Sequence, residues 1–136
     1  DSEHAFAVFL NLLGRHTEKL GAVDLASGLV KTIRQLEEWA CEAGIKKPSI
    51  YNFAVTDGES LATVRYVSNP QIEPISLYFS NRGRYMYHEG KFEIVQSDSE
   101  QSGIIIASER LTDDHTSWTR VAPNHVVIVD SQLDVI

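Results

Sequence analysis

The sequence predicts a single α+β domain over residues 1–136, with two helices followed by mostly antiparallel strands. Apolar residues recur at helical spacing up to Gly44, and from Ser49 onward short runs rich in β-branched and aromatic residues replace them. Turn-forming residues separate those runs. Because 43% of the residues are hydrophobic and 23% are charged, the composition is that of a globular protein with a real core.

The first predicted helix begins at the start of the chain and ends at Gly14. Its large apolar side chains follow i, i+3, i+4, i+7 spacing and share one face: Phe6, Phe9, Leu10 and Leu13. Asp1 stands before them, where a carboxylate can cap the helix and suits the positive end of its dipole.

Asp24 is expected to cap a second, longer helix that ends at Gly44, with Pro48 just beyond. The residues expected to form its buried stripe are Leu25, Leu29, Ile33, Leu36 and Ala40. The charged residues expected on its solvent face are Arg34, Glu37 and Glu38.

Two strands, at 49–56 and 60–68, flank the dipeptide Asp57-Gly58, which is typical of a β-hairpin turn. Further strands are predicted over 75–80, 91–95, 103–109 and 125–130, with loops at 69–74 and 98–103. The run at 103–108 is almost continuously apolar, which predicts a strand covered on both faces.

The charge balance disfavours anionic partners. Twelve basic residues against nineteen acidic ones give a net charge of -7, and the basic residues are scattered, so we expect no binding to nucleic acid or to a membrane. The single cysteine, Cys41, allows no internal disulfide, which favours a reducing, cytoplasmic location.

Several reactive residues have simpler structural interpretations. Cys41 lies late in a helix without a neighbouring cation, so it is expected to be a half-buried structural thiol. Asp113, Asp114 and His115 lack the paired spacing of metal ligands and are expected to form a polar loop. Ser108 has no G-x-S-x-G motif around it. We therefore expect no metal and no cofactor.

Five segments occur in the order in which one known family carries them: DSEHAFAVFLNLL, YNFAVTDGESLATVRYV, SLYFS, IIIASERLTDDHTSW and RVAPNHVVIV. The first resembles the T-D-S-E helix start of the class II glutamine amidotransferases, and the others resemble that family's hairpin, its next strand and its closing strands. The resemblance covers nearly the whole chain. It is strongest to the branch linked to glutathione breakdown and to γ-glutamyl hydrolysis in ergothioneine synthesis.

This resemblance implies an N-terminal-nucleophile αββα sandwich that cleaves γ-glutamyl amide or peptide bonds in glutamine, glutathione or a related compound. In the family an N-terminal Cys is the nucleophile, an Asn-Gly segment supplies the oxyanion hole, and an Arg holds the substrate carboxylate. These residues lie upstream of T-D-S-E, so we expect no catalytic residue in this chain. The sequence begins inside an amphipathic pattern without Met, as expected of the C-terminal portion of a glutamine amidotransferase type 2 domain.

The expected partner is accordingly an upstream half that carries the nucleophilic Cys, and an oligomer or a partner subunit is compatible with the same interpretation. Without that half, the chain is expected to be inactive. A function of another class stays open: a noncatalytic binding or assembly module, in which the same helices and sheet form a subunit interface.

Two residues are candidates for substrate binding. The resemblance matches Asp1 to the aspartate that binds the substrate α-ammonium, a charge-assisted contact of about 1.5–3 kcal/mol, whereas capping alone contributes about 1 kcal/mol. Glu109, at the end of an apolar strand, either faces a pocket or pairs with Arg110 or Arg120. Trp118 also matches a family position, but we expect it in a core or an interface.

Overall fold

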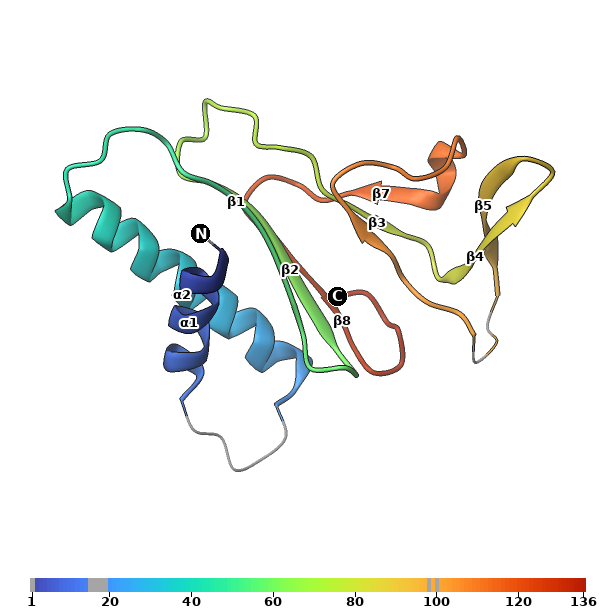
Figure 1. Ribbon diagram of the computed structural model, residues 1–136, viewed down its shortest axis with the longest axis horizontal. Coiled ribbons are helices and arrows are strands. Elements are labelled where there is room, and N and C mark those ends of the chain that lie inside the picture. The colour runs from blue at the N-terminus through green and yellow to red at the C-terminus, as the bar shows by residue number, and fades with distance from the viewer. Residues whose placement is uncertain (1, 15–19, 98, 100) are drawn as a thin grey trace.

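The computed structural model describes residues 2–14, 20–97, 99 and 101–136. Two helices come first and antiparallel strands follow, which confirms the predicted α+β class. Along the long axis in Figure 1, the helices lie at one end, a three-stranded sheet lies in the middle, and the remaining strands lie at the other end. No helix in the described ranges combines the length and the apolarity needed to cross a lipid bilayer.

Helix α1 covers Ser2–Leu13 and buries only part of the predicted apolar face. Phe9 is 3% exposed, but Phe6 and Leu10 are 52% and 51% exposed, because α1 packs mainly against α2 and leaves one side of itself uncovered. Gly14 follows with a left-handed φ of 73°, which agrees with its predicted role in ending the helix. An apolar strip of α1 is therefore open to solvent.

Helix α2 covers Ala22–Glu42, and its first turn differs from the prediction. Gly21 is the N-cap, and Asp24 sits three residues inside the helix, where its Oδ2 accepts the Gly21 N–H at 2.9 Å. The carboxylate still satisfies an N-terminal donor, but it does so by reaching back, as in a capping box. At the other end Gly44 takes a φ of 68°, which confirms the predicted stop.

The central sheet contains β1 (Ile50–Thr56), β2 (Leu61–Val67) and β8 (His125–Val129), in the order β1-β2-β8 with antiparallel neighbours. The predicted hairpin between β1 and β2 is confirmed. Asp57 Oδ1 accepts the N–H groups of the two residues that follow Gly58, at 2.9 and 2.7 Å, and Gly58 has a φ of 94°. The turn chemistry thus sets the register of this pair.

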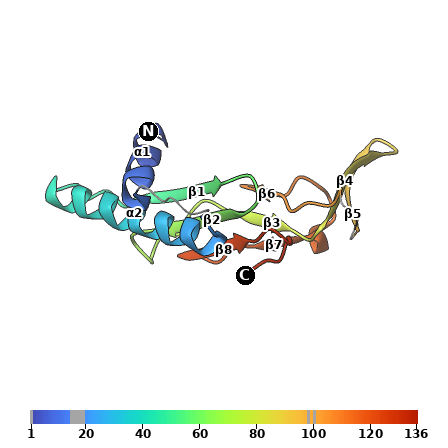
Figure 2. The ribbon, with the colours of Figure 1, turned by 90° about the horizontal axis from the view of Figure 1, so that it is seen from below.

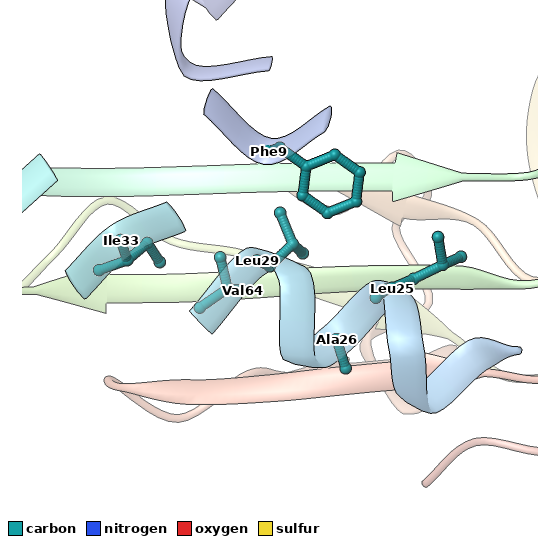
Figure 3. Close-up of a cluster of buried hydrophobic side chains, with 7 residues drawn as sticks. Phe9, Leu25, Ala26, Leu29, Ile33 and Val64 are labelled. Atoms are coloured by element: carbon teal, nitrogen blue, oxygen red, sulfur yellow. The ribbon is translucent and has the colours of Figure 1, made fainter. Parts of the chain in front are cut away.

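The helices cover one face of this sheet and form the main core with it (Figure 3). The buried members are Phe9, Leu25, Ala26, Leu29, Ile33, Ala62 and Val64. Phe9 reaches α2 closely enough that a Cβ built on Gly28 would lie 2.6 Å from its ring. Only glycine allows the two helices to approach in this way.

The remaining strands form a second sheet and a separate hairpin. The second sheet has the order β6-β3-β7, with bounds Ile106–Ala107, Tyr78–Ser80 and Trp118–Arg120, and a 3-10 helix, His115–Ser117, precedes β7. The hairpin pairs β4 (Gly83–His88) with β5 (Lys91–Gln96) and projects from the end of the molecule opposite the helices (Figure 2). The sequence patterns predicted β5 but not β4 or β7.

The apolar run 103–108 is half-buried or exposed rather than covered on both faces within the described residues, so that prediction was wrong. Only Ile106–Ala107 forms a strand, which pairs with β3 alone and so lies at a sheet edge. Ile104 and Ile105 are half-buried. A second, smaller core of Leu77, Val121 and Val127 lies near β3, with Phe79 and Ile106 packed against it.

Candidate functional site

A groove of about 370 Å³ runs between the first turns of α1 and strand β1. Ser2, the first residue of α1, is one of its lining residues. Asp1 itself lies outside the described residues. The full lining consists of Ser2, Glu3, Ala5, Phe6, Phe9, Leu29, Thr32, Phe53, Ala54 and Val55.

The groove is suited to binding an apolar group beside a charged one. Phe6, Phe53 and Val55 give apolar walls, and the exposed polar groups are Ser2 and Glu3 at the end of α1. The lining contains no thiol and no imidazole. The described residues can therefore hold a ligand here, but they offer no activated nucleophile of the Cys–amine kind.

The groove is bordered by an unpaired sheet edge. Ser68 N–H donates to Ser49 O at 3.0 Å and Asp57 N–H donates to Ser60 O at 3.3 Å, so hydrogen-bonded pairs stand at both ends of the β1–β2 ladder. Because such pairs alternate, the even-numbered residues of β1 point their N–H and C=O groups away from β2. No described strand pairs with this edge.

Asn52 stands on that edge and was missed by the sequence analysis. Its Nδ2 donates to Ser76 O at 2.9 Å, while its Oδ1 is buried without a hydrogen-bond partner among the described residues. A buried amide oxygen normally has a donor, so Asn52 Oδ1 is an exception among the described residues. An Asn in the otherwise apolar run IYNFAVT was the available signal.

We name the groove, the outward edge of β1 and the exposed side chains of Phe6 and Leu10 together the α1–β1 surface. It combines unpaired strand groups, an apolar strip and the start of a helix. Such a strand edge is a template for another strand. This surface is therefore the candidate functional site of the chain.

Glu109 is not among the residues that line the groove. It is exposed, in the bend after β6, and has no ion pair with any described residue. Both proposed partners are engaged elsewhere: the Arg110 guanidinium lies 5.3 Å from the centre of the Tyr78 ring, and Arg120 pairs with Glu73 at 2.8 Å. A pocket role for Glu109 stays a prediction.

Trp118 is buried, as predicted, with 7% of its surface exposed. Its Nε1 donates to Thr112 Oγ1 at 2.9 Å, so the polar end of the ring is satisfied inside the protein. Cys41, in contrast, is exposed rather than half-buried.

Asp114 has a structural role in the loop before β7. Its two carboxylate oxygens accept from Thr116 N–H at 2.9 Å, Thr116 Oγ1 at 2.7 Å and Ser117 Oγ at 2.6 Å. These hydrogen bonds, that of Ser117 first, lower the pKa of Asp114. In the part of the chain that the structure describes, no three His, Cys, Asp or Glu residues are grouped to hold a metal ion.

Arg65 is a buried side chain that donates four hydrogen bonds, and the sequence analysis did not single it out. It is 1% exposed and donates to the backbone oxygens of Ile75, Val121 and Pro74 at 2.9, 2.8 and 2.8 Å. Its Nη2 also donates to Glu73 Oε1 at 2.6 Å. It joins β2 to the segment leading into β3 and to the residue after β7. The available signal was a single Arg inside the apolar run LATVRYV.

The chain is 34% identical, over 144 aligned positions, to a protein of Saccharomyces cerevisiae described as "Probable glutamine amidotransferase DUG3". The alignment covers 97% of this chain, which spans 40% of the length of that relative. The similarity confirms the resemblance to glutamine amidotransferases that the five ordered segments indicated. No family model matches the chain, and no solved structure does so either.

Proposed function

We propose that this chain is the C-terminal portion of a class II glutamine amidotransferase-like hydrolase that cleaves γ-glutamyl amide or peptide bonds. The observation that carries the proposal is the similarity to a probable glutamine amidotransferase over 97% of the chain. The segment that resembles T-D-S-E borders the α1–β1 groove, where a substrate could bind. Glutamine, glutathione and related γ-glutamyl compounds are the proposed substrates, and a reducing intracellular compartment is the proposed location.

In the proposed reaction the nucleophile is an N-terminal Cys on an upstream portion of the same enzyme. Its thiolate attacks the γ-carbonyl carbon, the C–N bond breaks, and the leaving amine takes the proton. Water then hydrolyses the γ-glutamyl thioester, which releases glutamate and restores the thiol. Asp1 contributes a carboxylate that binds the substrate α-ammonium, and Glu109 is a second proposed contact.

The α1–β1 surface supports the proposal that an upstream portion of the enzyme packs against this chain. An upstream portion that adds a strand to β1 would satisfy the outward backbone groups of that edge. It would also cover Phe6 and Leu10. The assembled domain would then be the N-terminal-nucleophile αββα sandwich that the sequence resemblance implies.

Release of glutamate tests the proposal. The chain alone, the chain mixed with the Cys-bearing upstream portion, and the same mixture with that Cys replaced by Ala are each incubated with glutamine and with glutathione. Only the mixture with the intact Cys should release glutamate, and the two substrates show which leaving group is preferred. Robust turnover by the chain alone would place the nucleophile within it and contradict the proposal.

The α1–β1 surface also favours a second candidate, a noncatalytic assembly module whose exposed edge and apolar strip bind another subunit. The parent reading frame discriminates between the two. A Cys directly after the initiator Met, with Asn-Gly before Asp1, supports the enzyme. A reading frame without that Cys supports the assembly module.

A further inference from the structure

The β4–β5 hairpin carries large apolar side chains on one of its two faces. In the register of the pair, Tyr85 lies opposite Ile94 and Tyr87 lies opposite Phe92, and directly opposed residues of an antiparallel pair share a face. Tyr85 and Tyr87 are two positions apart, so both pairs lie on the same face. We name these four side chains the hairpin face.

The rings of the hairpin face pack against one another. The ring centres of Tyr85 and Phe92 lie 5.1 Å apart with planes only 2° from parallel, and the ring centre of Tyr87 lies 5.0 Å from that of Phe92. Aromatic pairs of this kind stabilise the hairpin from within. Much of each ring is nevertheless open to water, because Tyr85, Tyr87 and Phe92 are 41%, 66% and 49% exposed.

Within the described ranges, β4 and β5 form a two-stranded sheet of their own. The hairpin projects from the molecule (Figure 2), and two hydrogen bonds between Gly83 and Gly103, at 3.1 and 2.9 Å, hold its base. A two-stranded hairpin is only marginally stable in water unless its apolar face packs against another surface. The exposed rings therefore mark the hairpin face as an interaction surface.

The charges of the hairpin favour a second copy of this chain as the partner. Residues 83–96 contain two basic and two acidic residues, so the net charge of -7 lies entirely outside the hairpin. Two whole chains repel each other, but contact through the projecting hairpins keeps the acidic remainder of the two copies apart. A nucleic acid or an anionic membrane would need a cationic surface, which a neutral hairpin does not provide.

We propose that the hairpin face binds the hairpin face of a second copy of this chain, so that the two copies form a dimer with two-fold symmetry. A two-fold axis brings the same surface of each copy together, and an apolar face then meets an apolar face. The inference uses no residue of the α1–β1 surface and is independent of the proposed γ-glutamyl chemistry.

The size of the hairpin face makes this dimer weak. A stable interface takes about 800 Å² from each partner. Three aromatic side chains that bury about 150–250 Å² each supply less than that, even if they are buried completely. Association is therefore expected at high protein concentration, with a dissociation constant between about 10 µM and about 1 mM.

Two measurements on the unmodified chain test the proposal. Sedimentation equilibrium across that range of concentration should show a monomer that becomes a dimer. In an equal mixture of isotope-labelled and unlabelled chain, filtered NMR experiments should then show nuclear Overhauser effects between the rings of Tyr87 and Phe92 in different copies.

Matched variants locate the contact. Tyr87→Glu should weaken dimerisation by at least about tenfold, because the dimer would remove a carboxylate from water. Val95→Glu adds the same charge to the opposite face of the hairpin, where Val95 is also exposed, and should leave dimerisation unchanged. Nuclear Overhauser effects between β4 and β5 within one copy check that the hairpin of each variant is intact.

Two further samples test the competing occupants. Phe6→Glu alters the exposed apolar strip of α1 and should leave dimerisation unchanged. The chain mixed with the Cys-bearing upstream portion should still dimerise through the hairpin face. Loss of the dimer in that mixture would assign the face to the upstream portion and overturn the inference.

Three other results would also overturn it. They are a chain that stays monomeric across the whole range of concentration, equal dimerisation of Tyr87→Glu and Val95→Glu, and loss of the dimer in Phe6→Glu, which would place the contact on the α1–β1 surface. None of these outcomes bears on glutamate release by the reconstituted enzyme.

Discussion

Replacing Arg65 with Met removes the buried guanidinium while keeping a long apolar side chain. The replacement leaves three backbone oxygens, those of Ile75, Pro74 and Val121, without their donor. Because two of these hydrogen bonds are buried and the third is partly buried, water can replace the donor only in part. We therefore expect a large loss of stability.

The size of the loss follows from the contacts. A buried acceptor left without a donor costs about 1–3 kcal/mol, so three of them set a range of roughly 3–9 kcal/mol before relaxation. Local relaxation favours the lower part of that range, and Glu73, the charged partner of Arg65, is exposed and so is left hydrated. A domain is stable by only about 5–15 kcal/mol, so the variant should lose a substantial fraction of its stability.

Urea unfolding of the chain, followed by circular dichroism, measures this loss. Arg84→Met is the matched control, because Arg84 is exposed on β4 and a surface change of this kind alters the free energy of unfolding by about 0.5 kcal/mol or less. Arg65→Lys should fall between the two, since a lysine cannot reproduce the forked geometry of a guanidinium. If Arg65→Met unfolds at the same urea concentration as Arg84→Met, the network does not hold the segments together.

Two further predictions concern packing and pH. Gly28→Ala should lower the free energy of unfolding by about 1–3 kcal/mol, because the new Cβ would lie 2.6 Å from the Phe9 ring. Gly103→Ala is the control for the same urea titration. It should change the free energy of unfolding little, because no atom lies within 4 Å of the added Cβ. The hydrogen bond from Arg65 lowers the pKa of Glu73 below its ordinary value of 4.5. The ionised carboxylate therefore adds its full contribution to the free energy of unfolding above pH 4.5. That contribution is lost as the pH falls through the lowered pKa. Glu73→Gln should flatten the decline of unfolding free energy over that acidic range, and an unchanged pH profile would show that the contact with Arg65 contributes nothing to stability.

Much of the fold could be predicted from the sequence because interactions between residues close in sequence determine where helices end and strands turn. Asp57 and Gly58 form the turn between β1 and β2 by their own hydrogen bonds and backbone preference, and Gly44 ends α2 in the left-handed conformation. The short strand β7 was harder to predict, because Trp118 and its neighbours pair with β3 through contacts distant in sequence. Periodicity also cannot show what covers a helix face, which is why the exposure of Phe6 was not foreseen.

The candidate site was predicted only in part. The family resemblance directed attention to Asp1 and Glu109, but only the start of α1 borders the groove, and Glu109 lies in an exposed bend. Asn52 stood out in the sequence only as a polar residue in an apolar run. That its Oδ1 is buried without a partner among the described residues depends on the three-dimensional surroundings of the side chain.

The central claim is that this chain supplies the part of a γ-glutamyl site that binds the substrate α-ammonium. The most direct test is the KM of the reconstituted enzyme for glutamine and for glutathione, measured with Asp1→Asn and with Ser2→Ala as the neighbouring control. Asp1→Asn should raise KM by about ten- to a hundredfold, the effect of one charge-assisted hydrogen bond, with a smaller change in kcat. A KM equal to that of the unmodified enzyme would contradict the claim and leave Asp1 as a helix cap.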